Sequence, residues 1–167
     1  MLKIIRMPNQ LNIDQLIQVY SESIGDRMRD LHRDYSTNER RLLAESEFNT
    51  FWKCEFFKEE GALCAVWIEE DRYISVLRLQ AYADGLLLTG METAPEYRNK
   101  GAAKNLLCSV KEYLKKSGNV NIYSHISKRN LPSIHVHYFC GFTRLREGAT
   151  FLDGSVSWSY DTYILKI

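Results

Sequence analysis

The chain has 167 residues, of which 45% are hydrophobic and 26% are charged, a composition typical of one folded domain with a sizeable core. Its 22 lysines and arginines nearly balance its 21 aspartates and glutamates, so no net charge favours binding to nucleic acid or to an anionic membrane. No apolar run reaches the roughly 18 residues of a membrane-spanning helix, and the first residues lack the pattern of a signal peptide. We therefore expect residues 1–167 to form a single domain that binds neither nucleic acid nor a membrane.

The four cysteines, Cys54, Cys64, Cys108 and Cys140, lie far apart in the sequence and form no CxxC pair. Each stands in an apolar stretch, which favours buried free thiols over disulfides or zinc ligands. This usage of cysteine is typical of a reducing compartment, so we expect a cytoplasmic protein without a metal.

The N-terminal part of the chain predicts a short strand followed by two helices. The strand covers residues 2–6. Asn12 is typical of a helix N-cap, with Gln15 at the partner position of a capping box, and apolar residues then recur at helical spacing as far as residue 31. A second capping box at 36–39 predicts the start of the next helix.

The pattern then changes from helices to strands. The apolar run 62–68 and the segments 73–83 and 86–93 predict a three-stranded meander, with Asp84-Gly85 as a strong hairpin signal.

The C-terminal half alternates helices and strands. Apolar residues at helical spacing between 103 and 114 predict a helix that ends at Ser117-Gly118. Residues 119–126 alternate as a strand, 131–140 predict a helix, and two further strands flank a turn at 153–154. The expected order is β-α-α-β-β-β-α-β-α-β-β, which indicates a mixed α/β sheet and excludes a doubly wound fold.

The segment RNLPSIHVHYFCGF (129–142) contains two histidines separated by one residue. On a strand, His135 and His137 would share a face and could bind one metal ion. On a helix they point about 200° apart. Asn130 as N-cap and Gly141 as C-terminal glycine favour the helix, so we expect no metal site and a surface or packing role for His135.

A basic turn lies between the end of the third meander strand and the following helix. It runs from Arg98 through Asn99, Lys100, Gly101 and Ala102 to Ala103. The first N–H groups of a helix have no intrahelical partners, and they bind phosphate readily. The small residues leave room for an oxygen, and Arg98, Lys100 and Lys104 add positive charge. Neither GxxxxGK[ST] nor GxGxxG is present.

This turn resembles the cofactor loop of the GNAT superfamily of acyl-CoA-dependent N-acetyltransferases, Q/R-x-x-G-x-G/A. Arg98, Gly101 and Ala103 match its three specified places. The preceding TAPEYR is similar to the family's V-x-P-x-Y-R, with Thr93 replacing the common valine. The segment 129–142 is similar to the family's later helix, which opens with Asn and closes with Gly-Phe. The expected element order also resembles the family fold over nearly the whole chain.

The resemblance implies an enzyme that moves an acetyl group from acetyl-CoA to a primary amine by direct attack in a ternary complex. Acetyl-CoA would lie where the strand 86–93 separates from the strand 119–126. Backbone amides of the basic turn would hold the pyrophosphate, strand residues would pair with the pantetheine arm, and the later helix would reach the far side. The implied cofactor-binding residues are Met91, Thr93, Arg98, Asn99, Lys100, Gly101, Ala102, Ala103, Lys104, Asn130 and Ser133.

The resemblance also singles out a proton donor. A tyrosine of the family, seven residues after the helix-opening asparagine, is thought to protonate the departing CoA thiolate. Counting from Asn130 places His137 there, and counting back five residues from Phe142 gives the same result. An imidazole could protonate a thiolate whose thiol pKa is about 8.5, or it could only pack or donate one hydrogen bond. Tyr138, one residue later, is the alternative.

The reaction also needs a base, because an amine of pKa about 10 is protonated and not nucleophilic at neutral pH. Glu92, in the strand expected to carry the cofactor, is the first candidate. The alternative is that its side chain points away from the cleft. His125, late in the neighbouring strand, is the second candidate.

The acceptor, a small-molecule or peptide amine, is expected between the first two helices and the 143–165 hairpin. Two other functions stay open: a transferase that uses another acyl-CoA, and a non-catalytic acyl-CoA-binding regulatory domain. The absence of the family's tyrosine, in whose place His137 stands, favours the non-catalytic domain. The resemblance further implies a possible homodimer.

Overall fold

The computed structural model describes residues 1–31, 34–118 and 120–167. Within these residues, seven strands form a sheet in the order β1-β2-β3-β4-β5-β7-β6. β4 and β5 are parallel, and every other neighbouring pair is antiparallel. The expected mixed α/β sheet is therefore confirmed. No helix among the described residues is long and apolar enough to cross a membrane.

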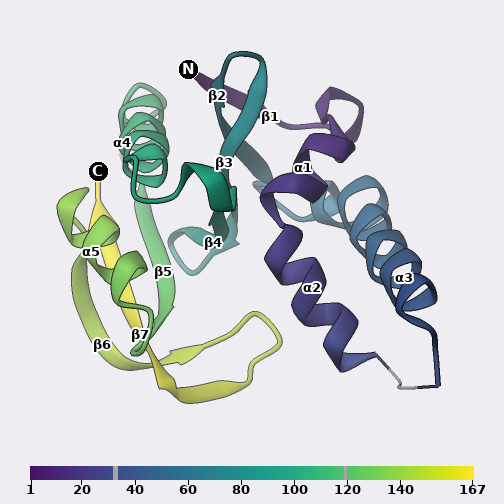
Figure 1. The fold of residues 1–167 in the computed structure, drawn as a ribbon. Coiled ribbons are helices and arrows are strands. Elements are labelled where there is room, and N and C mark those ends of the chain that lie inside the picture. The colour runs from purple at the N-terminus through teal and green to yellow at the C-terminus, as the bar shows by residue number, and fades with distance from the viewer. Residues whose placement is uncertain (32–33, 119) are drawn as a thin grey trace.

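The helices lie on the two faces of this sheet, α1 to α3 on one side and α4 on the other (Figure 1). In chain order the elements are β1 (Leu2–Ile5), α1 (Ile13–Val19), α2 (Ser21–Asp30), α3 (Thr37–Thr50), β2 (Leu63–Glu69), β3 (Arg72–Tyr82), β4 (Gly85–Thr93), α4 (Ala102–Lys115), β5 (Asn121–Ser127), α5 (Leu131–Phe139), β6 (Thr143–Thr150) and β7 (Val156–Lys166).

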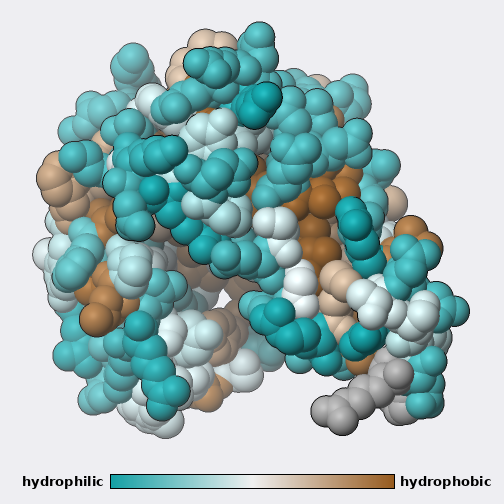
Figure 2. Space-filling model, viewed as in Figure 1, coloured by the Kyte–Doolittle hydropathy of each residue, from teal (hydrophilic) through white to brown (hydrophobic). Residues whose placement is uncertain are grey.

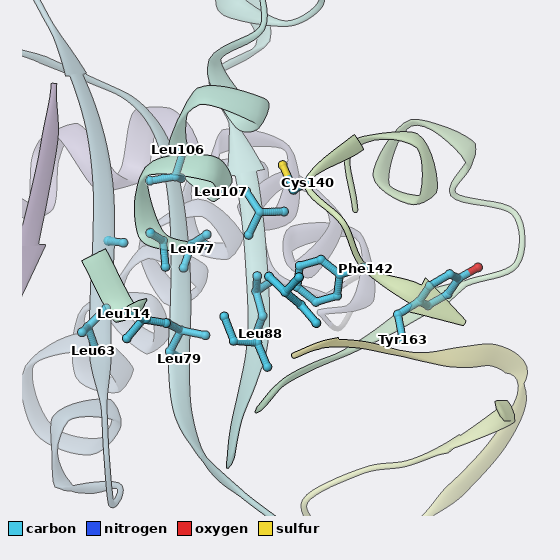
Figure 3. Close-up of a cluster of buried hydrophobic side chains, with 14 of the residues drawn as sticks. Leu63, Leu77, Leu79, Leu88, Leu106, Leu107, Leu114, Cys140, Phe142 and Tyr163 are labelled. Atoms are coloured by element: carbon cyan, nitrogen blue, oxygen red, sulfur yellow. The ribbon is translucent and has the colours of Figure 1, made fainter. Parts of the chain in front are cut away.

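Two hydrophobic cores fill the spaces between the sheet and its helices. Along β2, Leu63 and Ala65 face the core under α4, and Cys64 and Val66 face the core under α1 to α3. This alternation follows from the period of two in a strand, and it explains why β2 reads as a continuous apolar run. Figure 3 shows the α4 core, where leucines of the sheet meet leucines of α4 and where Phe142 enters from beyond α5.

The first predicted helix is divided into α1 and α2 at Tyr20, whose φ of −93° and ψ of 18° interrupt the helix. The side chain of Asn12 accepts a hydrogen bond from the Gln15 N–H, as predicted. The Gln15 side chain, however, bonds to the backbone of Asp71 and Tyr73 and does not return to Asn12. The expected capping box is therefore only half formed, because β3 competes for the glutamine.

The other predicted boundaries differ from the observed ones by one or two residues. At Ser36 both hydrogen bonds of the second capping box are present. The β3–β4 hairpin turns at Ala83-Asp84, one residue earlier than expected, because Tyr82 pairs with Gly85. β5 begins at Asn121, and residue 119 of the predicted strand lies outside the described residues.

All four cysteines are free, as expected, but not all are buried. Cys64 and Cys140 are buried, Cys108 is half-buried, and Cys54 is exposed, so the expectation of a buried thiol is wrong for Cys54. It lies in a π-helical turn after α3, two residues after the buried Trp52. The sulfurs of Cys108 and Cys140 lie 3.0 Å apart between α4 and the end of α5.

A β-bulge in β4 changes the direction of its side chains. Two residues, Gly90 and Met91, face the single residue Leu77 of β3. Leu88 before the bulge and Met91 within it therefore both contact the core under α4. Glu92 consequently faces the opposite side of the sheet, toward α2.

Gly90 makes this bulge possible. Its φ is +54°, and a Cβ atom at this position would lie 2.6 Å from Nη2 of Arg78. The guanidinium of Arg78 is itself held over the ring of Phe51, 4.7 Å from its centroid. The hydroxyl of Tyr20 donates to the Gly90 carbonyl oxygen at 2.5 Å, which connects the α1–α2 junction to the bulge. Arg78 of β3 and Tyr20 at the α1–α2 junction therefore both hold the bulge in place.

β4 and β5 pair over only four residues, from Gly85 opposite Asn121 to Leu88 opposite Ser124. Beyond these pairs the two strands separate, so residues 89–93 of β4 do not pair with residues 125–127 of β5. Such a separation of parallel strands leaves backbone N–H and C=O groups free inside the sheet.

Candidate active site

A cavity of about 690 Å³ lies where β4 and β5 separate. Figure 2 shows the surface hollowed at this place, above the β6–β7 hairpin. β4, β5, α5 and the hairpin all contribute side chains to it. The lining residues are Leu87, Leu88, Thr89, Gly90, Met91, Glu92, Ser124, His125, Ile126, Ser127, Asn130, Ser133, His137, Phe151, Leu152, Asp153, Ser155 and Tyr160.

The predicted phosphate turn follows β4 through a short 3-10 helix at Pro95–Tyr97 and lies outside the cavity lining. Gly101 is the N-cap residue of α4, with φ of +85°, and no side chain caps the helix there. A Cβ atom on Gly101 would meet nothing within 4 Å. The turn is therefore an open cradle whose first helical N–H groups point outward. These features fit an anionic group such as a phosphate.

The three basic side chains near this turn have different surroundings. Arg98 is not directed at the turn, because it forms an ion pair with Glu22 at 2.8 Å and donates to the Thr93 carbonyl oxygen at 3.1 Å. Lys104 Nζ lies 4.0 Å from the centre of the Phe139 ring, so it connects α4 with α5. Lys100, over the ring of Tyr97, stands beside the cradle. Charge near the turn thus comes from the two lysines.

The start of α5 forms one wall of the cavity. The Asn130 side chain accepts a hydrogen bond from the Ser133 N–H at 3.1 Å and caps the helix, as predicted. Asn130 and Ser133 both line the cavity. His135, one helical face away, is exposed, whereas His137 is buried, so the two imidazoles do not share a ligand site.

His137 is only 1% exposed and lines the cavity from α5. Its Nδ1 lies 2.7 Å from the Ser133 carbonyl oxygen. A carbonyl oxygen can only accept, so Nδ1 carries the proton. Burial lowers the pKa of His137 to about 4, against the opposing effect of that hydrogen bond. At neutral pH the ring is therefore neutral and Nε2 is an acceptor, without a hydrogen-bond partner among the described residues.

Tyr138, the alternative proton donor, does not reach the cavity. Its side chain is 48% exposed, and its ring stands edge-on to Tyr163, with 5.6 Å between the centroids. The helical rotation of about 100° between adjacent residues explains why His137 faces the cavity and Tyr138 faces β7.

Glu92 lines the cavity and does not point away from it. The Ser23 hydroxyl of α2 donates to its Oε1. Burial raises the pKa of the Glu92 carboxyl, while Ser23 and then Arg98 act in the opposite direction. A carboxylate with a raised pKa is a better proton acceptor, so its position and its chemistry both suit a base.

The β6–β7 hairpin closes the other end of the cavity with Phe151, Leu152 and Tyr160. His125, the second candidate base, lies against this wall with its ring edge-on to Phe151 at 5.5 Å. Burial, and to a smaller extent Arg146, lowers the pKa of His125. Its two ring nitrogens are buried without hydrogen-bond partners among the described residues, so it packs as a neutral aromatic ring.

The first two predicted helices, which correspond to α1 with α2 and to α3, were expected to form part of the acceptor site, but none of their residues lines the cavity. Ser23 approaches it only through Glu92. The reason is the β-bulge, which turns Glu92 toward α2 and so places a strand residue between the helix and the cavity.

Comparison with known proteins agrees with this geometry. A family model described as "Acetyltransferase (GNAT) family" matches residues 25–142. This chain belongs to the GNAT acetyltransferase family. It is therefore an acyltransferase, and its mixed sheet with the separated central strands is the GNAT fold. No curated protein matches the chain.

Solved structures with this GNAT fold include several acetyltransferases. The PaiA N-acetyltransferase from Thermoplasma acidophilum in complex with coenzyme A is 17% identical, with a TM-score of 0.64 over 100% of this chain and 99% of that one. The ribosomal-protein-S18-alanine N-acetyltransferase from Escherichia coli is 17% identical, with a TM-score of 0.63 over 100% and 94%. A putative streptothricin acetyltransferase from Bacillus anthracis, in complex with acetyl coenzyme A, is 14% identical, with a TM-score of 0.53 over 68% and 66%.

Sequence reasoning missed several residues of this GNAT site. Ser23, which donates to Glu92, lies 69 residues away in the chain. Phe151 and Tyr160 line the cavity although nothing in the spacing of the hairpin indicates it. Their only sequence signal is aromatic character near the predicted turn at 153–154, which is equally typical of hairpin packing.

Proposed function

We propose that this chain transfers the acetyl group of acetyl-CoA to a primary amine by direct attack in a ternary complex, and that residues 1–167 form one N-acetyltransferase domain. One observation carries the proposal: the cavity between the separated strands contains a carboxylate, Glu92, and lies between β4 and α5, next to an uncapped helix start. The acceptor is a small-molecule or peptide amine. The solved relatives with bound coenzyme A or acetyl coenzyme A support this choice of co-substrate.

The turn at the start of α4 would hold the pyrophosphate. The open cradle at Gly101 fits this group, because a Cβ atom there would meet nothing within 4 Å and the first N–H groups of α4 have no side-chain cap. Lys100 and Lys104 contribute charge. Arg98 serves the site differently, since its bonds to Thr93 and Glu22 fix the turn relative to β4 and α2.

The free edge of β4 would position the rest of acetyl-CoA, which supplies the activated acetyl thioester. Backbone groups of Met91 and Thr93 lie beyond the last β4–β5 pair and have room for an added extended segment. Asn130 and Ser133 would contact it from α5. Holding both substrates in one cavity removes much of the entropic cost of their meeting.

Glu92 would remove the proton from the attacking amine. Its Oε1 is held by the Ser23 hydroxyl, which leaves Oε2 for an ammonium group. Burial raises the pKa of this carboxyl and so brings its basicity closer to that of the amine.

His137 would act as a hydrogen-bond acceptor. With its proton on Nδ1 and a pKa of about 4, the imidazole has no proton to donate from Nε2 at neutral pH. The first proton of the ammonium group goes to Glu92 before the attack. As the C–N bond forms and the C–S bond breaks, the nitrogen loses a second proton, which would pass to the departing thiolate and give the free thiol. Nε2 would accept a hydrogen bond from that thiol. Tyr138 takes no part, because it lies outside the cavity.

Two measurements on the purified chain test the proposal. Acetyl-CoA at roughly millimolar concentration should raise the melting temperature by mass action. A thiol-release assay with acetyl-CoA and a library of amines should then show turnover. A thermal shift without release for any amine would support a non-catalytic acyl-CoA-binding domain. A rise in the melting temperature with another acyl-CoA but not with acetyl-CoA would show that the acyl donor is different. No rise with any acyl-CoA would overturn the proposal.

A further inference from the structure

The cavity of this protein has two chemically different ends. At α5 the lining is polar, with Ser127, Asn130 and Ser133. At the hairpin the lining is mainly aromatic and apolar, with Phe151, Leu152 and Tyr160, and its two polar residues, Asp153 and Ser155, hydrogen-bond to each other. The polar end suits the amide-rich arm of the co-substrate assigned above, so the hairpin end is left for the acceptor.

The aromatic end is a fixed surface. Phe151 stands edge-on between His125 and Tyr160, at centroid distances of 5.5 and 5.3 Å. His125 in turn stands edge-on to Tyr82 at 5.4 Å. These distances lie in the range of stabilising aromatic pairs, so three neighbouring contacts hold the rings in place.

Two hydrogen bonds to backbone carbonyl oxygens hold the loop that carries Phe151. The Phe151 N–H donates to the Ser155 carbonyl oxygen at 2.8 Å. The Tyr82 hydroxyl donates to the Thr150 carbonyl oxygen at 3.0 Å, which joins the end of β6 to β3. A preorganised apolar surface of this kind binds an apolar group without first losing conformational entropy.

The charges of the cavity are few and of one sign. Neither lysine nor arginine is among the lining residues. Of the two lining carboxylates, Asp153 is exposed, and its Oδ1 accepts both the N–H and the hydroxyl of Ser155. Glu92 is half-buried and keeps Oε2 without a hydrogen-bond partner among the described residues. The cavity therefore offers one half-buried carboxylate, Glu92, for a cation, and no cationic side chain for an anion.

The spacing along the sheet fits a short molecule. Thr89 follows the last β4–β5 pair, at the level of His125, and Glu92 stands three residues later on the bulged strand. At about 3.3 Å per residue, shortened by the bulge, this separation is roughly 7 to 10 Å. An aromatic ring with a two-carbon amine is of this size.

We propose that the acceptor is an arylalkylamine, a primary monoamine whose ammonium group meets Glu92 and whose ring packs on Phe151 and Tyr160. This inference rests on the proposed function and names its substrate class. A polyamine would place a second ammonium group against the aromatic wall or beside Asp153, which is exposed and already bonded to Ser155. An acidic amine would find no cation in the lining.

The proposal is tested with four acceptors in the thiol-release assay: 2-phenylethylamine, butylamine, spermidine and a tripeptide with N-terminal alanine. We expect kcat/KM to be about tenfold or more higher for 2-phenylethylamine than for butylamine, because burying the ring adds apolar contact. The other two should be poorer still. Turnover that favours spermidine, butylamine or the tripeptide overturns the arylalkylamine and leaves the transferase intact. No release with any amine overturns the proposed function and this inference with it.

Variants of the hairpin identify the ring surface. Phe151→Ala should lower kcat/KM for 2-phenylethylamine about tenfold or more and that for butylamine much less. Phe151→Leu, which keeps an apolar side chain, should give an intermediate loss and guards against misfolding of the smaller variant. Trp158→Ala is the matched control, since Trp158 is on the same hairpin but is 69% exposed and outside the cavity. An unchanged preference in both Phe151 variants, with the acetyl-CoA thermal shift retained, overturns the proposal.

Discussion

The two ends of the candidate site are built from different parts of the chain. The cradle at the start of α4 consists of consecutive residues, 98–103, and its chemistry comes from the backbone and from the space beside Gly101. The acceptor end consists of side chains from β4, β5 and the β6–β7 hairpin. A backbone site needs only small residues at a helix start, whereas a side-chain site needs particular residues brought together by the whole sheet. The two ends should therefore respond differently to substitution.

The largest expected effect is at the cradle. Gly101→Glu places a carboxylate and a Cβ atom in the space for the phosphate, so acetyl-CoA should no longer raise the melting temperature. Gly118→Glu is the matched control, because Gly118 also has a positive φ and open space but follows the other end of α4. Thermal shift assays with both variants check this. A shift retained in Gly101→Glu would show that the cradle is not the pyrophosphate site.

Much of the cradle could be predicted from the sequence because local residues determine it. Gly101, the amphipathic pattern of the next helix and the preceding proline all act within about 20 residues of one another. Helix α5 was predictable for the same reason, since Asn130 caps it and Gly141 follows its end. Short-range rules of helix termini are sufficient here.

The acceptor end could not be predicted in the same way. The direction of Glu92 depends on the bulge at Gly90, and that bulge depends on Tyr20 and Arg78 from distant segments. Tertiary contacts also override the local pattern in the first predicted helix. They accompany its division into α1 and α2 at Tyr20 and leave the capping box at Asn12 half formed. The protonation of His137 likewise depends on burial, which no motif encodes.

The next largest effect is expected for the base. Glu92→Gln keeps the shape of the side chain and its contact with Ser23 but cannot take a proton at neutral pH. We expect kcat/KM to fall about 100-fold or more, with the acetyl-CoA thermal shift unchanged. Glu96→Gln, at an exposed position in the turn after β4, is the control and should retain full turnover. Steady-state thiol release measures both, and an active Glu92→Gln enzyme would remove the carboxylate from the mechanism.

His137 should also make the stability of the fold depend on pH. Its pKa is about 4 when folded and 6.5 as the unperturbed value, so between these values only the unfolded chain binds the proton. The contribution of neutral His137 is fully present above pH 6.5 and is lost as the pH falls toward 4, by about 3 kcal/mol in all. His137→Phe should therefore flatten the loss of stability over this window in urea unfolding. His135→Phe, on the exposed side of α5, should not, and equal slopes for the wild type and His137→Phe would contradict the buried neutral imidazole.

The same substitution should have a smaller effect on catalysis. If His137 only accepts one hydrogen bond, His137→Phe should lower kcat by about three- to tenfold and leave the affinity for acetyl-CoA nearly unchanged. A loss of about 100-fold or more, together with a pH–rate inflection that disappears in the variant, would restore the role of general acid. Steady-state kinetics between pH 6 and 9 separate the two roles.

The smallest effect is expected one residue later. Tyr138→Phe removes only the hydroxyl and keeps the ring that packs edge-on against Tyr163, so the fold should be unaffected. Because this side chain faces β7 and is absent from the cavity lining, kcat should change by less than about twofold. The result also tests the orientation of α5, because residues 137 and 138 point about 100° apart on a helix and cannot both face the thioester. A large loss in Tyr138→Phe, with little loss in His137→Phe, would mean that α5 turns by about 100° when acetyl-CoA binds. In that case the α5 wall of the cavity would reach its final form only when acetyl-CoA binds, whereas the backbone cradle at Gly101 is already open without it.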